Sequence, residues 1–92
     1  MSKKIFKYQL ETTDVQQVEM PIGAEILCIQ TQNESPCIWA LVNPANQTIK
    51  RTFEIFGTGH NVPENGNRKY IGTYQLNDGS LVFHCFELFG LE

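Results

Sequence analysis

The segment Leu81–Phe89 constrains the fold more than any other, because it is apolar on both of its alternating faces. Its sequence, LVFHCFELF, has the β-branched and aromatic residues and the length typical of a β-strand. A strand that is apolar on both faces has to be covered on both. The chain has no convincing helical segment of ten residues to provide a second cover. Either the sheet folds over itself, as a barrel or a sandwich, or another copy of the chain covers it.

Six further segments are expected to be strands separated by turns. Alternating or apolar patterns mark residues Phe6–Leu10, Val15–Met20, Ala24–Gln32, Cys37–Asn43, Ile49–Phe56 and Tyr70–Leu76. Before Leu81 the dipeptide Asp78-Gly79 strongly predicts a hairpin. The spacing of Val15 and Val18 also permits one helical turn. The sequence therefore predicts an all-β fold of about seven mostly antiparallel strands in a small barrel or sandwich, with at most one short helix.

Length and composition limit the class of protein. A chain of 92 residues predicts a single β domain over residues 1–92, and 41% hydrophobic with 18% charged residues indicates a globular rather than a disordered chain. The formal charge of −3 argues against general nucleic-acid binding. No apolar run has the length of a signal peptide or a membrane span. Cys28, Cys37 and Cys85 lie in strand-like runs and are expected to be reduced thiols, which favours the cytoplasm.

The longest connection, residues 57–69, is the first place to look for function. Loops of about a dozen residues are uncommon in compact domains and are usually functional or disordered. Here the loop begins with Gly57-Thr58-Gly59-His60, and successive glycines let backbone N–H groups converge on an anion, with the threonine and histidine as further donors. The alternative is that the glycines only permit a bulge or a bend.

Two cations stand where the chain re-enters a strand after this loop. Arg68 offers a planar fork suited to phosphate or carboxylate, and Lys69 offers a point charge. We expect both to contact an anionic ligand from the rim of the site, where Arg68 should contribute to binding but little to folding. The alternative is that these charges only form a solvated rim.

Aromatic residues could complete such a site. Trp39 lies in the apolar run Ile38–Val42, so core packing is its first interpretation and a stacking platform for a flat ligand is the second. Tyr70 and Tyr74 are expected to share one face of their predicted strand. For them too, the ring either packs in the core or stacks against a flat ligand.

The residues give no support for catalysis. His60, His84 and the cysteines show no metal-ligand spacing, and the set of nucleophile, base and oxyanion donors that an enzyme needs is missing. His84 between Phe83 and Cys85 is typical of a hydrogen-bonded core or interface histidine. We expect no enzymatic activity, no metal and no cofactor.

Several runs along the chain together resemble a known group of proteins. They are KKIFKYQLE, EMPIGAEIL, PCIWALV, RTFEIFGTGH, RKYIGTYQL and GSLVFHCFE. As a set, from Lys3 to Glu87, they resemble small uncharacterised proteins encoded by bacteriophages and prophages, grouped as a domain of unknown function. The resemblance implies a phage accessory protein in the cytoplasm of a bacterial host. It implies no catalytic residues.

Together these observations predict a non-enzymatic binding protein. The expected ligand is a small anionic molecule, plausibly a nucleotide or an ADP-ribose-type immune signal that the protein sequesters. The expected contacts are Thr58, Gly59, His60, Arg68 and Lys69 to phosphate, with Trp39 or Tyr70 against the base. The alternative is an inhibitor that binds a host protein through an edge strand or an apolar face. A homo-oligomer is expected, with the strand Leu81–Phe89 at or near the interface.

Overall fold

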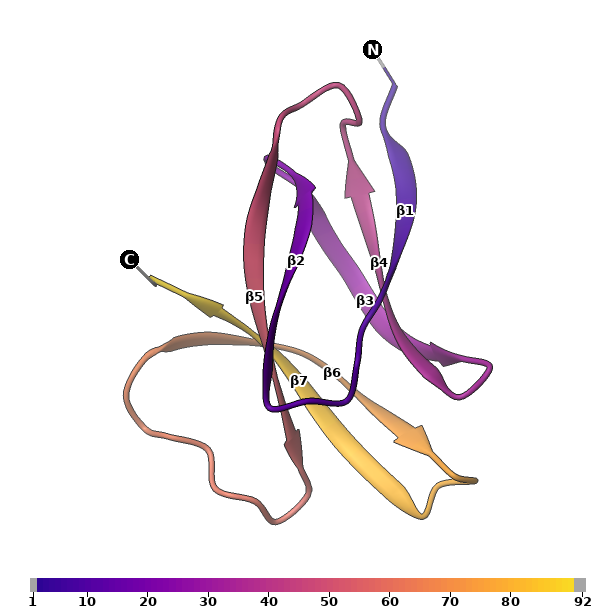
Figure 1. Ribbon diagram of the computed structural model, residues 1–92, viewed down its shortest axis with the longest axis vertical. Helices are drawn as coiled ribbons and strands as arrows, with labels where there is room; N and C mark the ends of the chain where they lie inside the picture. The colour runs from indigo at the N-terminus through magenta and orange to yellow at the C-terminus, as the bar shows by residue number, and fades with distance from the viewer. Residues whose placement is uncertain (1, 91–92) are drawn as a thin grey trace.

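The computed structural model describes residues 2–90, which form seven strands and no helix (Figure 1). The strands are β1 (Lys4–Gln9), β2 (Val15–Pro21), β3 (Glu25–Gln32), β4 (Ser35–Val42), β5 (Thr48–Gly57), β6 (Asn67–Leu76) and β7 (Leu81–Phe89). Three of them form sheet A in the order β1-β4-β3, and four form sheet B in the order β2-β5-β7-β6. Every hydrogen-bonded pair is antiparallel. The predicted all-β fold is confirmed, and the segment that also permitted a helical turn is strand β2.

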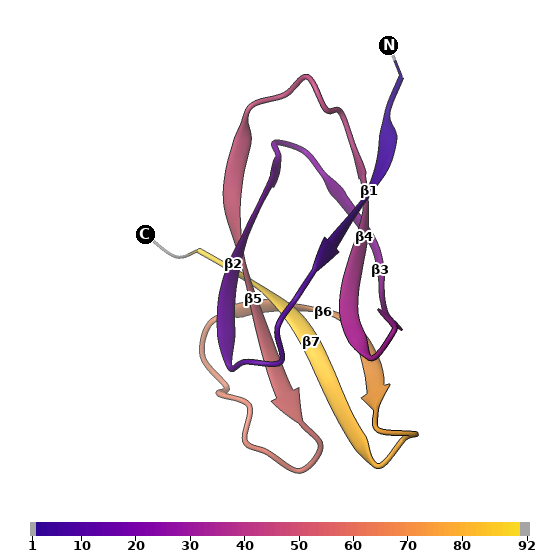
Figure 2. The same cartoon turned by 45° about the vertical axis from the view of Figure 1, so that its right-hand side comes forward.

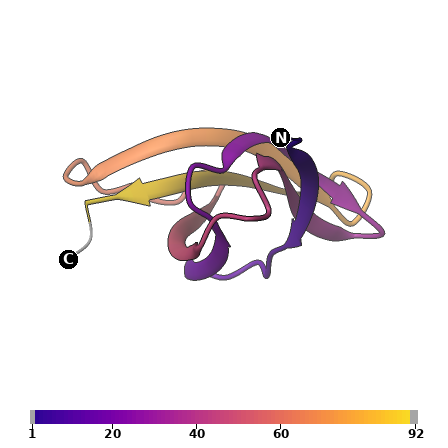
Figure 3. The same ribbon diagram turned by 90° about the horizontal axis from the view of Figure 1, so that it is seen from above.

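The two sheets pack as a flattened sandwich and do not close into a barrel. The principal extents are 43 × 33 × 15 Å, and the view from above shows the thin dimension (Figure 3). Figure 2 shows β2 running beside β5 on one side of the molecule and the β6–β7 hairpin at its lower end. The core between the sheets consists of Leu10, Met20, Ala24, Ile29, Ile38, Ala40, Val42, Phe53, Ile55, Tyr74 and Cys85. Among the described residues no helix is long and apolar enough to cross a membrane.

Strand β7 lies inside sheet B, between β5 and β6, so both of its edges are paired. Cys85 and Glu87 point into the core and are fully buried or nearly so. The residues of the other face, such as His84 and Phe86, are half-buried because side chains of β5 and β6 flank them. The two-faced apolar pattern of this strand is therefore largely satisfied within one chain.

The sheets approach each other along a seam where β3 and β6 lie side by side without a backbone ladder. Each of these strands has a bulge in the ladder with its sheet partner, at Leu27 in β3 beside β4 and at Ile71 in β6 beside β7. The expectation that Tyr70 and Tyr74 share one strand face is wrong, because the bulge at Ile71 leaves Tyr70 on the outer face and Tyr74 in the core. Gly72 of β6 lies against Ile29 of β3, and a Cβ there would stand 2.8 Å from Cγ2 of Ile29. A side chain at position 72 would therefore push the sheets apart.

A buried ion pair between β5 and β7 of sheet B also contacts the turn before β3. Arg51 donates from Nε and Nη2 to the Glu87 carboxylate at 2.6 and 2.8 Å, and from Nη1 to the Ala24 carbonyl at 2.6 Å. Glu87 is 3% exposed. Because an isolated charge at this depth is strongly unfavourable, each partner depends on the other.

A hydrogen bond between two hairpin turns, one from each sheet, also connects the sheets. Asn77 and Asp78 both have φ of 54° and are followed by Gly79 at 86°, so the predicted hairpin after β6 is confirmed. The turn between β3 and β4 places Glu34 at φ 64°, and its carboxylate accepts a hydrogen bond from the Asn77 N–H at 2.8 Å. This contact ties the tip of sheet A to the tip of sheet B.

Candidate functional site

Arg68 fixes the long loop against sheet B. Its Nε donates to Glu54 at 2.8 Å, and its Nη1 donates to the carbonyl oxygens of Pro63 and Asn65 at 2.7 and 2.8 Å. The side chain is only 12% exposed. The expectation that Arg68 is an exposed rim charge is wrong. The guanidinium is enclosed because the loop ends on β6 directly above the Glu54 carboxylate of β5.

The glycines at the start of the loop serve a tight turn. The His60 N–H donates to the Gly57 carbonyl at 3.0 Å, and Gly59 has φ of 88°, which favours glycine. A Cβ at Gly57 would stand 3.0 Å from Cε1 of His60, so the imidazole lies directly on the backbone of Gly57. The turn thereby holds one face of the His60 ring and leaves the residue exposed to solvent.

A cavity of about 240 Å³, here called the loop cavity, opens beside this turn. It is lined by Phe56, Gly57, Thr58, Gly59, His60, Val62, Tyr70, His84 and Phe86. Three rings form its wall: Phe86 meets Phe56 and Tyr70 edge-on, with centroid distances of 5.8 and 5.4 Å. None of the described residues lining it carries a carboxylate, a guanidinium or a lysine ammonium. The cavity is suited to a flat ring with a few polar groups.

A chain of hydrogen bonds holds His84 at the base of this cavity. Its Nε2 lies 2.7 Å from Oγ1 of Thr58 and its Nδ1 lies 2.9 Å from Oγ1 of Thr73, which also bonds the Tyr70 hydroxyl. Thr58 donates its own proton to the Val82 carbonyl at 3.3 Å. Both ring nitrogens of His84 therefore have a hydroxyl partner, and the tautomer of the ring sets which hydroxyl donates to it.

A second hollow of about 400 Å³, here called the hairpin cavity, also borders this turn. It is lined by Gly57, Thr58, His60, Ser80, Leu81, Val82 and Phe83. Gly57, Thr58 and His60 border both hollows. The two hollows therefore share part of their lining, and a ligand with two parts could extend from one into the other.

The structure brings together four of the seven residues expected at the site. Thr58, Gly59, His60 and Tyr70 all line the loop cavity. The other three do not line it. Arg68 is paired with Glu54, and Trp39 and Lys69 lie on other surfaces.

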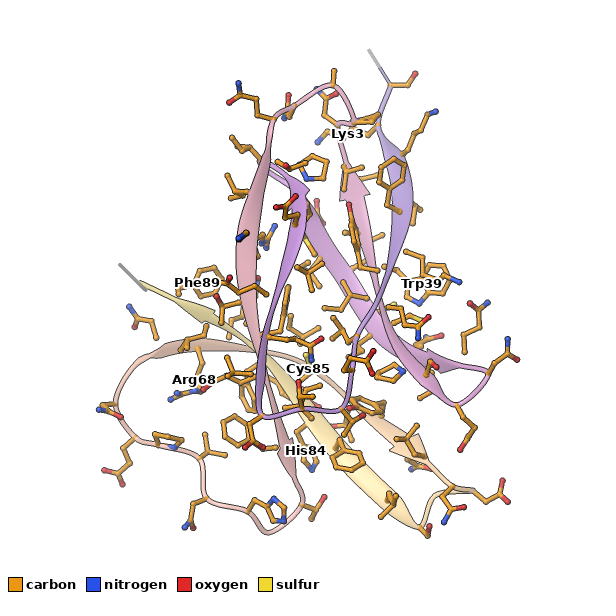
Figure 4. The ribbon with its side chains drawn as sticks, in the orientation of Figure 1. Lys3, Trp39, Arg68, His84, Cys85 and Phe89 are labelled. Carbon is orange, nitrogen blue, oxygen red and sulfur yellow. The ribbon has the colours of Figure 1, made fainter. Side chains whose placement is uncertain are left out.

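In Figure 4 Trp39 lies at the right of the molecule, Arg68 at the left and His84 near the lower middle. Trp39 is half-buried on β4, opposite Lys7 of β1, and belongs to sheet A. Lys69 pairs in register with Glu87 and lines a separate cavity of about 200 Å³ with Arg51 and Glu87. Neither residue shares the loop cavity, so the predicted set of seven is not one site.

Three residues of the cavity were not expected there, namely Phe56, His84 and Phe86. A signal for two of them was present in the sequence: residues at every second position of β7 share a face, which places His84 and Phe86 together. The contribution of Phe56 depends on the pairing of β5 with β7, which sets Phe56 opposite His84. Local pattern contains no information on that register.

The described part of the chain has no cluster of side chains arranged to bind a metal, and its most buried thiol is not activated. No group of three His, Cys, Asp or Glu side chains there could hold a metal ion. Burial, with a smaller contribution from the negative charge of Glu87, raises the pKa of the Cys85 thiol to about 12. Cys85 is thus a protonated, buried thiol at neutral pH rather than a nucleophile.

The fold and the hollows define a small two-sheet β protein with a candidate ligand site beside one long loop. The chain belongs to the family described as Domain of unknown function (DUF7352), whose model matches residues 1–90. No curated protein and no solved structure matches the chain.

Proposed function

We propose that this protein binds a small, nucleotide-like anionic molecule in the loop cavity without changing it chemically. In keeping with the resemblance to proteins of phages and prophages, it would act in the bacterial cytoplasm as an accessory protein that sequesters such a molecule, plausibly a signal of host immunity. The observation that carries the proposal is the cavity itself, where an aromatic wall, two histidines and a glycine turn meet.

The aromatic wall supports recognition of a flat ring. Tyr70 is 54% exposed although its ring contacts Phe86, so one face of it remains available to a base. Base–aromatic stacking contributes roughly 1–3 kcal/mol per base. A volume of about 240 Å³ is smaller than that of a typical drug-sized site, which suits a base or similar ring with the rest of the ligand outside.

The Gly57–His60 turn supports the placement of the polar part of the ligand. Thr58 and His60 border both the loop cavity and the hairpin cavity, so a phosphate or ribose there would lie between them. The lysine and arginine side chains of the described residues line neither hollow. Backbone N–H groups and neutral donors would therefore contact the anionic group, which favours a ligand of modest charge.

Calorimetric titration against nucleotides tests the proposal. The panel includes AMP, ADP-ribose, cyclic dinucleotides and cyclic ADP-ribose isomers. Tyr70→Ala should weaken binding about tenfold, because it removes one stacking partner. Trp39→Ala is the matched control, since it removes an aromatic side chain from the other sheet. Absence of heat from every compound, or equal loss in both variants, would overturn the proposal. Recovery of the ligand unaltered after denaturation distinguishes binding from catalysis.

We also propose that the protein self-associates through the outer face of sheet B, where β7 contributes Phe86. Val15, Glu54, Phe86 and Tyr70 form one row across the four strands, and Val15 and Tyr70 at its ends are 56% and 54% exposed. A second copy would cover the Val15 end of this row and leave the Tyr70 end open to the ligand. Light scattering coupled to size exclusion should give a mass above 10.5 kDa at high concentration, and a constant 10.5 kDa would refute self-association.

A further inference from the structure

Two sheets that do not close leave four edge strands in the described part of the chain, namely β1, β3, β2 and β6. β3 and β6 each contain a bulge in the ladder with their sheet partner, and their free edges face each other along the seam. Bulges of this kind commonly protect an edge against pairing with another chain. Two regular edges remain, and these are β1 and β2.

The two regular edges differ in charge. β1 contains Lys4 and Lys7 and follows Lys3, whereas β2 contains Glu19 and follows Asp14. None of the three lysines takes part in either of the ion pairs found among residues 2–90. Lys7 donates to the neutral Gln32 side chain at 2.7 Å. The chain as a whole has a formal charge of −3, so β1 is a positive edge on a negative protein.

The β1 edge is also accessible and regular over its whole length. Its register with β4 runs without a shift from Lys4 to Gln9, and every residue in it except Tyr8 is exposed. Ile5 is 60% exposed and Phe6 is 36% exposed. An extended segment beside β1 would therefore find backbone groups over about 20 Å, apolar side chains on both faces and a lysine on each face.

From the charge, regularity and exposure of this edge, we propose that β1 binds an extended acidic segment of another protein by strand addition. Main-chain hydrogen bonds to the free edge would hold the segment, and carboxylates opposite Lys4 and Lys7 would select it. The β2 edge, with Asp14 and Glu19, would repel the same segment. This surface lies on sheet A and does not depend on a ligand in the loop cavity of sheet B.

A second copy of the chain is a poorer occupant of the same edge. Pairing β1 with β1 of another copy would gather the lysines of both copies on one ladder, which is unfavourable. Pairing β1 with the acidic β2 edge of another copy is a head-to-tail contact, which extends into an open filament unless a ring closes. Lysines on an edge strand are a common protection against both kinds of association.

A labelled octapeptide that alternates glutamate and valine tests the proposal against intact protein by fluorescence anisotropy. The wild type should bind it, more weakly as salt is raised, and should not bind the matching lysine–valine octapeptide. The double variant Lys4→Gln/Lys7→Gln should bind about three- to tenfold more weakly. The double variant Lys50→Gln/Lys69→Gln loses the same charge from sheet B and should bind like wild type.

Amide hydrogen exchange then locates the contact. With the glutamate–valine peptide present, amides within residues 4–9 should gain protection. The proposal is overturned if neither peptide binds, if both double variants weaken binding equally, or if the new protection lies outside β1. It is also overturned if these amides become protected in the protein alone as its concentration is raised, because the occupant is then a second copy.

Discussion

Arg68 and Glu54 form an ion pair with Nε and Oε1 2.8 Å apart, and the same guanidinium binds two carbonyl oxygens of the loop that leads to it. One side chain thus links β5, β6 and the connection between them. The loop cavity lies beside this anchor, so its shape depends on a contact that is not itself part of the lining.

Removing the anchor should loosen the loop and lower stability. Arg68→Ala leaves the Glu54 carboxylate and the carbonyls of Pro63 and Asn65 without this donor, and we expect a loss of about 2 kcal/mol in the free energy of unfolding. Lys69→Ala, on the opposite face of the same strand, should change it by less than about 0.5 kcal/mol. Urea titration measures both. Equal stability of the two variants would show that Arg68 is not the anchor.

A side chain at Gly72 should strain the seam between the sheets. Gly72→Ala places a Cβ 2.8 Å from Cγ2 of Ile29, and overpacking of this kind typically costs about 1–3 kcal/mol. The added Ile29→Ala substitution removes the clashing methyl group. In a double-mutant cycle the two losses should be clearly less than additive. Strict additivity would place the cause of the Gly72→Ala defect elsewhere.

The buried pair of Arg51 and Glu87 should show strong coupling. Glu87→Gln leaves a guanidinium at 16% exposure without its counter-charge, and breaking such a pair typically costs about 3–5 kcal/mol. The double variant Arg51→Met/Glu87→Gln removes both charges and should recover part of that loss. Thermal unfolding of the three proteins checks this, and a double variant less stable than Glu87→Gln would contradict it.

The Cys85 thiol should make stability depend on pH in the alkaline range. Its pKa is raised from 9.0 to about 12 in the folded protein, first by burial and then by Glu87. Its contribution is therefore fully present below pH 9 and is lost as the pH rises towards 12, by an amount on the order of 4 kcal/mol.

Denaturant titrations between pH 8 and 11 measure this slope, with Cys85→Ala as the control that lacks it. In the native protein at pH 8 a thiol reagent should modify the half-buried Cys28 before Cys85. Rapid labelling of Cys85, or identical slopes in both proteins, would mean that the thiol is not buried in this way.

Sequence pattern was sufficient for the strands because each alternation and each turn is a local signal. Asp78-Gly79 predicted its hairpin from backbone preference alone, and it has the expected positive φ angles. Whether the sheet closed into a barrel or packed as a sandwich was not determined by these signals. That choice depends on the bulges at Leu27 and Ile71 and on how closely Gly72 lets the strands approach.

The site was only partly predictable for the same reason. Thr58, Gly59 and His60 are adjacent in sequence and stay together in the turn. Adjacent residues in a strand point to opposite faces, so Lys69 is separated from Arg68 and Tyr70. The pairing of Arg68 with Glu54 spans two strands and is invisible in a single sequence.

The central claim, that the loop cavity binds a nucleotide-like molecule, is tested most directly by amide chemical shifts. ¹⁵N-labelled protein would be titrated with AMP and with ADP-ribose. The account predicts that the largest shifts fall on residues 57–60 and on Tyr70, His84 and Phe86, with little change around Trp39. Shifts centred on Trp39, or no shifts with either compound or with the rest of the nucleotide panel, would contradict it.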